Sequence, residues 1–483
     1  MNALQEILDN LKANAPMSLE EIIQMEVSQW EGSEERKKMI TGKKYYRNEN
    51  DILTLERKTI DEDGRLVAVK NLADNRIPHG FVRKLVDQKL GYLLARPFMV
   101  ETEKKAYQDL LDGYFDKGLK KMLKNLGKEA INAGKSWLQV YYTEEGELSF
   151  MKIPSEEGIP FWKDAAHTEL AAFIRVYETE EYVVKRKEKI KYVQFWTLDG
   201  VRIYRENTGR FELMEERSHF TVTTRDGEVT TEQGTNWERI PFICFKYNDE
   251  EQPLIDLVKK LVDDYDKRTS GNSNDLEDLP NSAYVVKNFI GTGAGEFRKN
   301  MAQYRVAFVS GDGDIKTVSI EMNNEGYKNH IEQLRRDIYE FGRGVDTQSD
   351  KFGNSPSGIA LRFLFSDLDM DANDLESEFQ SSLEQLLWFI DTHIEKTLNV
   401  DYSEDPVEFI FNRDILINET EAVENAKNSV GIESMETIVA NHPWTINTKE
   451  EMDRKERERK ADEIKYLNLG GEQDAVEKDE GQD

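Results

Sequence analysis

Two amphipathic helical patterns flank a short strand-rich stretch, and this order is the feature that most limits how the chain can fold. Residues three and four apart share one face of a helix, and apolar residues follow that spacing in two stripes: Leu254, Leu257, Val258, Leu261, Val262 and Tyr265, then Tyr327, Ile331, Leu334, Ile338 and Phe341. Between the stripes lie the strand-like runs AYVVKNF, YRVAFVS and IKTVSIE and a helical piece, EFRKNMAQ. We predict a stalk of two helices that holds a small α/β insertion away from the body.

The two stripes also indicate self-association. An isolated pair of helices buries little apolar surface, and helices in proteins are stabilised mainly by packing of their apolar faces. We therefore expect the stripes to pack against equivalent helices from other copies of the chain. The sequence predicts an oligomer.

The stretch DTQSDKFGNSPSGIALRFLFSDLD, residues 346–369, joins a flexible loop to a helical pattern. The hydroxyl of Ser355 can cap free N–H groups, and Pro356 loses no hydrogen bond at the first helical position. Apolar residues then recur at helical spacing from Ala360 to Leu398, which predicts about 40 residues of helix. We expect a loop with glycine freedom that is firmly fixed at its C-terminal end.

The rest of the chain predicts an α+β fold that is mainly α. Ser18 and Glu21 form a capping-box signature for a helix through about Trp30, and residues 77–94 and 110–133 have helical apolar spacing. From residue 137 to 245 the pattern changes to short runs typical of antiparallel strands. A strand at 407–411 and helices at about 419–430, 433–441 and 448–466 follow, and the acidic tail 469–483 is expected to be disordered.

Composition excludes several classes of protein. The 483 residues carry a formal net charge of −29, which argues against a broad surface that grips nucleic-acid phosphate. Basic clusters at 37–47, 83–89 and 120–128 are better explained as solvated helix faces than as phosphate contacts. Apolar runs such as PFICF are too short to span a bilayer. The first residues lack the pattern of a secretory signal, and Cys244, the only cysteine, is expected to be a buried core thiol.

Motifs for catalysis, metals or cofactors are weak, and we predict no enzyme, metal or cofactor. GTGAGE, residues 291–296, lacks the ending of a phosphate loop and is interpreted as a turn. Ser310, Asp312, Asp314 and Glu321 have calcium-loop spacing, but Ile315 stands where the sharp turn requires glycine, so we interpret GDGD as a hairpin turn. The six histidines show no metal-binding spacing.

Four segments resemble the portal proteins of tailed double-stranded DNA bacteriophages, the head-to-tail connectors, in the branch common in phages of Gram-positive hosts. The segments are GKKYYRNENDIL, NRIPHGFVRKLVDQKLGYLLARPF, LVDDYDKRTSGNSNDLEDLPNSAYVV and DTQSDKFGNSPSGIALRFLFSDLD. The resemblance covers residues 1 to about 463 and lies in the order and spacing of these segments. In LLARPF the family more often has glycine before the proline, which affects only the local turn.

The resemblance implies a dodecameric ring with a central channel for double-stranded DNA. It implies the following regions: wing, 1–250; first stem helix, 251–271; clip, 272–320; second stem helix, 321–345; tunnel loop, 346–355; long wing and tunnel helix with a return strand, 356–411; crown helices, 412–468; acidic tail, 469–483. The expected partners are the terminase large subunit, a head-completion or adaptor protein, the scaffold protein and the major capsid protein. We expect the protein in the virion, at the portal vertex of the capsid, and in the host cytoplasm during assembly.

The resemblance also implies which residues face the channel. The tunnel loop would present Gln348, Ser349, Asp350, Lys351, Phe352, Gly353 and Asn354, with Lys351 as the cation nearest DNA. Weaker candidates for DNA contact are Arg335, Arg336, Arg343 and Arg362, for each of which an intersubunit salt bridge is an alternative at least as strong. An acidic channel wall would repel phosphate, so that DNA slides without sequence specificity.

Two other classes of function remain open from the residues. A nucleic-acid-processing enzyme would need a carboxylate site for a divalent metal. A cytoplasmic scaffold or adaptor that binds proteins through acidic helices would explain the composition, but not the order of helix, insertion, helix, loop and long helix.

Overall fold

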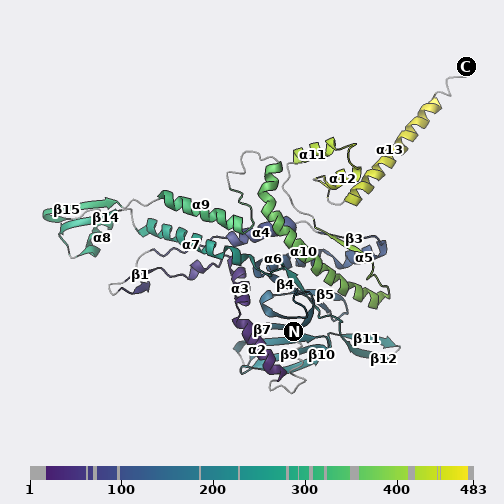
Figure 1. The fold of residues 1–483 in the computed structure, drawn as a ribbon, viewed down its shortest axis with the longest axis horizontal. Helices are drawn as coiled ribbons and strands as arrows, with labels where there is room; N and C mark the ends of the chain where they lie inside the picture. Colours follow the sequence, from purple (N-terminus) through teal and green to yellow (C-terminus); the bar gives the residue numbers. More distant parts are fainter. Residues whose placement is uncertain are drawn as a thin grey trace.

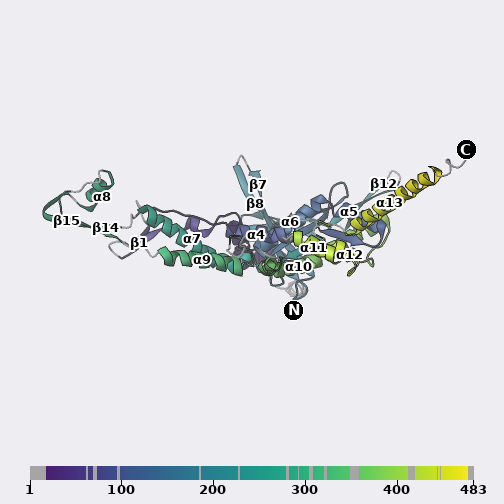
Figure 2. The ribbon, with the colours of Figure 1, turned by 90° about the horizontal axis from the view of Figure 1, so that it is seen from above.

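The computed structural model describes residues 18–60, 64–68, 73–94, 98–183, 186–226, 229–278, 282–291, 293–303, 308–319, 324–348, 358–411, 419–442, 444–445 and 448–476. The molecule is elongated and has a central body (Figure 1). Helices α7 (Leu254–Asp278) and α9 (Asn324–Phe341) leave the body together on one side, and α13 (Thr448–Val476) extends on the opposite side. Seen from above, the molecule is flattened, and the hairpin of β7 (Leu170–Val183) and β8 (Arg186–Thr197) projects from the body (Figure 2).

The predicted order of helix, insertion and helix is confirmed. A distal unit lies beyond the far ends of α7 and α9 (Figure 1). It consists of β14 (Ser282–Phe289), α8 (Ala294–Gln303) and β15 (Val309–Ser319), with β14 and β15 paired antiparallel. The third predicted strand of the insertion, IKTVSIE, falls largely on β15, which also contains the last two residues of the second, YRVAFVS; residues 304–307 and 320–323 lie outside the description.

The GDGD stretch, residues 311–314, is not a hairpin turn as expected from sequence. It lies within β15, where the pairing passes from Lys287 opposite Asp314 to Phe289 opposite Val309. The extra residues on β15 form a bulge, which the left-handed φ of +58° at Gly311 accommodates. Asp312 accepts hydrogen bonds from Lys287 Nζ at 2.8 Å and from Asn288 Nδ2 at 3.0 Å.

The expectation that both stalk stripes pack on other copies is wrong at the base of the stalk. There Leu254, Val258, Val262 and Ile338 are completely buried within this chain's own core. The reason is that α7 starts inside the body, in contact with α3 (Glu34–Tyr46), α4 (Phe81–Leu93) and α6 (Lys117–Ala133). Of the predicted stripes, Leu257 and Phe341 stay exposed, and Leu276 is exposed near the far end of α7.

A polar stripe on α7 binds an extended chain segment, residues 73–80, which we call the strap. The stripe consists of Asp266, Ser270 and Asn274, each one helical turn apart and each at most 5% exposed. The strap's backbone N–H groups donate to this stripe, from His79 to Asp266 Oδ1 at 2.9 Å, from Ile77 to Ser270 Oγ at 3.0 Å and from Asn75 to Asn274 Oδ1 at 2.6 Å. The strap therefore runs along the stalk helix as a third chain segment.

The helices of the body differ in detail from the sequence prediction. Ser18 caps α2 (Leu19–Gly32) in a complete capping box, as predicted. Helix α4 begins at Phe81 rather than 77, because residues 77–80 belong to the strap. The helix predicted at 110–133 is two helices, α5 (Lys105–Tyr114) and α6, because the Asp116 carboxylate caps α6 by accepting from the N–H of Leu119 at 2.7 Å. The short helices are η1 (Asp51–Thr54) and η2 (Ser155–Glu157).

All named strand pairs are antiparallel, as predicted for residues 137–245. The largest sheet has the order β10-β9-β8-β7-β6, and a second has the order β13-β4-β5. Further pairs are β1-β2, β11-β12 and β16-β3. The strands not yet bounded are β1 (Lys58–Ile60), β2 (Leu66–Ala68), β3 (Met99–Thr102), β4 (Lys135–Tyr142), β5 (Leu148–Ile153), β6 (Gly158–Trp162), β9 (Gly200–Asn207), β10 (Arg210–Arg217), β11 (Phe220–Asp226), β12 (Val229–Thr235), β13 (Phe242–Lys246) and β16 (Val407–Ile410).

The long helix α10 (Gly358–Leu398) spans 41 residues and lies across the body (Figure 1). Its buried face, which includes Leu375, Phe379, Leu383 and Ile390, joins the main core. Ser355 and Pro356, the predicted start of this helix, lie outside the described residues. Cys244 on β13 is buried, as predicted, and burial raises the pKa of its thiol.

The C-terminal helices follow the sequence prediction except at the end. They are α11 (Glu419–Asn428), α12 (Met435–Ala440) and α13. Helix α13 continues to Val476, so residues 469–476 do not form the irregular tail that was expected. Leucine, glutamate, glutamine and alanine favour helix there despite the two glycines at 470 and 471. The remaining residues, 477–483, lie outside the description.

The three basic clusters fall on α3, α4 and α6, which pack against one another. Two of their lysines point inward and are not the solvated charges that we expected. Lys43 pairs with Glu129 at 2.6 Å, and Lys89 pairs with Asp371 at 2.8 Å with its side chain only 2% exposed. A cation held largely out of water needs a partner charge, which both the buried Lys89 and the half-buried Lys43 have.

Candidate functional site

The candidate site is the turn after α9, where the chain enters the predicted tunnel loop, together with the face of α4 that holds it. Gln88 on α4 binds both backbone groups of Val345: its Nε2 donates to the carbonyl at 2.7 Å and its Oε1 accepts from the N–H at 3.2 Å. Lys84, one turn earlier on α4, lies 3.4 Å from the hydroxyl of Thr347. We call this contact the loop anchor, formed by Lys84, Gln88 and residues 345–347.

An ion pair closes the anchor from the other side. Arg335 on α9 donates through Nε to Asp346 Oδ2 at 2.9 Å and through Nη2 to Oδ1 at 2.7 Å. The carboxylate also accepts from the backbone N–H of Gln348 at 3.1 Å. Although partial burial raises the pKa of Asp346, these hydrogen bonds outweigh it and hold the pKa below its ordinary value. The two-pronged geometry fixes the direction of the chain as it leaves α9.

A buried charge network connects the same turn to α10. Lys89 Nζ binds Asp371 Oδ2 at 2.8 Å and lies 3.3 Å from the carbonyl of Arg343. Asp371 Oδ1 accepts from the hydroxyl of Tyr247 at 2.7 Å. Arg343, whose φ is +47°, reaches Asp374 on α10 at 3.0 Å. Helices α4, α9 and α10 are thus joined at one point.

Two glycines let the turn approach α4 closely. A Cβ at Gly344 would lie 2.2 Å from Leu85 Cδ2, and a Cβ at Gly342 would lie 2.7 Å from Leu85 Cδ1. Leu85 itself is completely buried. A side chain at either position would therefore push the turn away from α4 and separate Gln88 from Val345.

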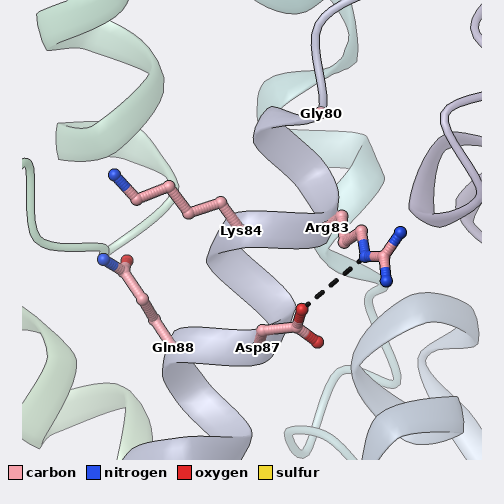
Figure 3. A pocket seen from close by; sticks show the side chains of 5 residues that line it. All are labelled: Gly80, Arg83, Lys84, Asp87 and Gln88. Atoms are coloured by element: carbon pink, nitrogen blue, oxygen red, sulfur yellow. Dashed lines mark ion pairs between the residues drawn. The ribbon is translucent and has the colours of Figure 1, made fainter.

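An open pocket of about 440 Å³ lies along α4 beside the anchor and is lined by Gly80, Arg83, Lys84, Asp87 and Gln88. Lys84 and Gln88 project to one side of the helix, toward the anchor, and Arg83 and Asp87 project to the other (Figure 3). Arg83 and Asp87 form a loose, exposed pair at 3.8 Å. The residues at 84 and 88 are four apart and so share a helix face, which is the sequence signal that could have indicated this contact.

The predicted site residues are only partly within the description. Gln348 is an exposed turn residue, whereas Ser349, Asp350, Lys351, Phe352, Gly353 and Asn354 lie outside the described residues. Arg335 and Arg343 form ion pairs within the chain, and Arg336 is exposed with its Nη1 3.5 Å from Gln333 Oε1. Arg362 lies on α10, but its side chain is outside the description. Sequence reasoning found Arg335 and Arg343 but missed Gln88, Lys84 and Lys89.

The described part of the chain offers no group of three or more His, Cys, Asp or Glu side chains arranged to hold a metal ion. Of the residues with calcium-loop spacing, Asp312 is paired as given above, Asp314 lies 3.8 Å from Lys316, and Glu321 is not described. Among the described helices, none combines the length and apolar character that crossing a membrane would require.

The family model for phage portal proteins of the SPP1 Gp6-like type matches residues 29–465, which include the stalk, the distal unit, the anchor and α10. This chain belongs to that portal family. The portal protein of Clostridium phage phiCD119 is 32% identical to it over 435 residues, which are 86% of this chain and 91% of that protein. The portal protein of Bacillus phage SPP1 is 28% identical over 452 residues, which are 91% of this chain and 88% of that protein.

A solved structure, the neck of a native GTA particle computed with C12 symmetry, aligns with a TM-score of 0.38 at 10% identity, over 74% of this chain and 88% of that chain. A likeness this low supports no conclusion about the chain. Membership of the portal family makes the protein a structural component of the bacteriophage virion, at the connection of head and tail through which the genome is packaged. The matched family and both relatives are named as portal proteins and not as enzymes.

Proposed function

We propose that twelve copies of this chain form a ring at one vertex of the capsid, whose channel conducts double-stranded DNA inward during packaging and outward during ejection. The observation that carries the proposal is the loop anchor, at which α4, α9 and α10 meet around the start of residues 349–357. A segment held this rigidly at its start can be presented at the same radius by every copy. Membership of the portal family supports the same function.

The parts of the subunit would take the following roles. Residues 1–250 and 356–411 would form the wing, α7 and α9 the stem, the distal unit the clip, residues 346–355 the tunnel loop, and residues 412–468 the crown. Because α7 continues to Asp278, the stem would extend some residues beyond the boundary at 271 drawn from the sequence.

DNA contact would fall to the tunnel loop. Lys351 would touch phosphate, and the neighbouring residues 348–354 would shift as the helical polymer passes. Arg335 and Arg343 form ion pairs within the chain, which favours an anchoring role for them over DNA contact. The net charge of −29 would keep DNA from adhering to the wall, so that passage is independent of sequence.

Partner proteins would dock at both ends of the subunit. The distal unit carries exposed apolar side chains, Val285, Ile290 and Phe308, at the end of the stalk farthest from the body. It would receive the terminase large subunit during packaging and a head-completion or adaptor protein afterwards. The body would meet the scaffold and major capsid proteins during assembly in the host cytoplasm.

Negative-stain electron microscopy of the purified protein, with its mass from light scattering, tests the ring. We expect rings with a central hole and a mass near twelve subunits. A compact monomer or dimer that persists across salt, magnesium and protein concentration would contradict the proposal and favour an adaptor that binds proteins through acidic helices.

A second experiment tests the loop itself. The double variant Lys351→Ala and Gly353→Ala should form rings but package or retain less DNA, because it loses the cation and the backbone freedom of the loop. Unchanged packaging and retention of DNA would contradict the proposed contact between the loop and DNA. The proposal that the chain forms a ring would not be affected.

A further inference from the structure

The hairpin of β7 and β8 continues well beyond the sheet that contains it. Within the described residues, β6 pairs with β7 only from Leu170 to Arg175, and β9 pairs with β8 only from Tyr192 to Thr197. The outer parts of the two strands, residues 178–183 and 186–191, pair with each other alone. We call this two-stranded projection the arm. It leaves the flat face of the molecule (Figure 2).

The arm is built to contact another surface. Two-stranded ribbons are marginally stable in water, and both edges of this one present unpaired backbone groups. Tyr182 near the tip is 82% exposed. The tip sequence YVVKRK, residues 182–187, contains three basic residues and no acidic residue, whereas Glu178, Glu180 and Glu181 on β7 balance the lysines nearer the sheet. Lys187 pairs with Glu180 and Lys189 lies 3.8 Å from Glu178, and the side chains of both lysines remain 53% and 70% exposed.

A cleft of about 750 Å³ lies beside β6, an edge strand of the same sheet. Its walls are Trp30, Ile159, Pro160 and Trp162, and its acidic residues are Glu34, Glu35, Glu250, Glu251 and Asp256, against the cations Lys38 and Lys135. We call it the acidic cleft. Its charge is opposite to that of the tip of the arm, where the sequence places Lys185, Arg186 and Lys187, and its aromatic walls suit a tyrosine side chain.

Side chains on one side of the acidic cleft are held in place by ion pairs and ring stacking, and those at its rim are exposed to solvent. Lys135 is held between Glu35 at 2.8 Å and Glu251 at 2.5 Å, and the ring of His167 stacks on Trp162 with centroids 4.9 Å apart. At the rim, Glu34 is 81% exposed and pairs with Lys37 of its own helix at 2.7 Å, and Glu250 is exposed. A cation that comes from outside would share Glu34 with Lys37 and could also approach Glu250.

The arm cannot reach the cleft of its own chain. Trp162, which lines the cleft, pairs with Leu170 at the first end of β7, whereas Tyr182 lies near the other end. At roughly 3.3 Å per residue, Tyr182 lies about 40 Å along the strand from Leu170. It lies about 26 Å from Ile174, which pairs with the cleft residue Ile159. A contact between the tip of one copy and the cleft of another joins two different surfaces, which is the head-to-tail kind that can close into rings.

We propose that the arm of each copy docks in the acidic cleft of the next copy, so that the tip lysines and arginine meet its carboxylates and Tyr182 lies against its aromatic wall. This inference rests on the proposed ring and names one contact that holds neighbouring copies together. It predicts that the contact weakens with added salt, because the attraction between exposed charges is screened.

Cysteine cross-linking tests the contact, since the native Cys244 is buried. One preparation carries Tyr182→Cys and another Glu34→Cys, and the two are mixed before assembly and treated with a short bis-maleimide. We expect cross-linked dimers in the mixture and not in either preparation alone. A mixture of Tyr182→Cys with Lys460→Cys, an exposed position on α13, is the matched control and should give none. No dimer with Glu34→Cys would overturn the proposal.

Charge reversal gives an independent readout. The triple variant Lys185→Glu, Arg186→Glu and Lys187→Glu should need at least about tenfold more protein to assemble, and Glu34→Lys with Glu250→Lys in the same chain should restore assembly. The control Lys455→Glu with Lys460→Glu should assemble normally. Circular dichroism checks that the variants fold.

The outcomes separate this inference from the proposed function. If the triple variant assembles into rings normally, the proposed contact between arm and cleft is overturned, while the proposal that the chain forms a ring still stands. A triple variant that forms rings but no longer binds capsid or scaffold protein would also overturn it and assign the arm to that partner. If the native protein forms no ring at all, the ring proposal fails, while the cross-link between the Tyr182→Cys and Glu34→Cys preparations still decides whether arm and cleft meet.

Discussion

The side chain of Gln88 satisfies both the N–H and the carbonyl of Val345, a residue that follows it by 257 positions in the sequence and is 4% exposed. The pair behaves like a short piece of β-ladder made by one amide side chain. It fixes the backbone one residue before Asp346, where the predicted tunnel loop begins.

Loss of this amide should loosen the start of the loop. Gln88→Leu leaves two buried backbone groups without partners, and we expect the free energy of unfolding to fall by about 2 kcal/mol. Hydrogen exchange at residues 345–347 should accelerate. The neighbouring change Asp87→Ala, which removes a loose ion pair and an exposed hydrogen bond from Tyr46, is the control and should leave this exchange unchanged. Unchanged exchange in Gln88→Leu would contradict the anchor.

The close approach at Gly344 makes a steric prediction. Gly344→Ala should destabilise the fold by about 1–3 kcal/mol, because its methyl group would overlap Leu85. Leu85→Ala also destabilises the fold, but it removes the overlapping atoms, so the double variant should be less unstable than the two single effects added together. Denaturant unfolding of the four proteins measures this difference. The control Gly113→Ala on α5, where a Cβ meets nothing within 4 Å, should not destabilise the fold. If the effects of Gly344→Ala and Leu85→Ala simply add in the double variant, the predicted overlap of the two side chains is refuted.

The role of Arg335 can be separated from a role in DNA contact. If its function is to hold Asp346, then Arg335→Ala and Asp346→Ala should each lower stability by about 1 kcal/mol, and the double variant should lower it little further. Packaging should fall equally in both single variants. If packaging falls in Arg335→Ala and stays normal in Asp346→Ala, the arginine contacts DNA instead. Arg335→Lys should behave like a partial loss, since lysine lacks the two-pronged geometry.

Acid stability should depend on Glu129, a buried carboxylate on α6 that binds Lys43, Lys152 and the N–H of Ser155. Burial raises the pKa of Glu129, but the two ammonium groups outweigh it and hold the pKa below the ordinary value. A depressed pKa in the folded state gives stability that is present above the unfolded pKa and is lost as pH falls through the folded pKa.

We therefore expect Glu129→Gln to lower the free energy of unfolding by about 3 kcal/mol at pH 7. The gap between the native protein and the variant should narrow as pH falls below about 4, because the native carboxylate is then protonated too. Unfolding in denaturant at a series of pH values from 7 to 3 measures this difference in the free energy of unfolding. Glu34→Gln, an exposed position, should follow the native curve throughout, and a gap that stays constant with pH would show that the carboxylate's charge is not the cause.

Sequence pattern predicted the parts of the fold that are governed by apolar periodicity. The spacing of Leu254, Val258 and Val262 predicted α7, and the short β-type runs before Phe245 predicted the antiparallel sheets. The pattern could not say where the stripes are buried, because the same spacing serves a core inside one chain and an interface between chains. It also misplaced GDGD, since a glycine with a left-handed φ suits a bulge as well as a turn.

The candidate site was harder to predict than the fold. Periodicity does not report a hydrogen bond between a glutamine on one helix and a backbone 257 residues later. The charges of Arg335 and Arg343 were visible, but whether a cation is paired inside the chain or offered to DNA depends on the positions of Asp346 and Asp374 in space. Lys89 was missed because a lysine in a basic cluster is usually solvated, whereas this one is buried and paired with Asp371.

The strap gives the stalk a mechanical property that two helices alone would not have. A pair of parallel rods bends easily in the direction perpendicular to the plane that contains them. The strap binds α7 over two helical turns, from Asp266 to Asn274, and continues directly through Gly80 into α4. A push or twist applied to the distal unit is therefore resisted by three chain segments, and one of them delivers the load to the helix that carries Gln88.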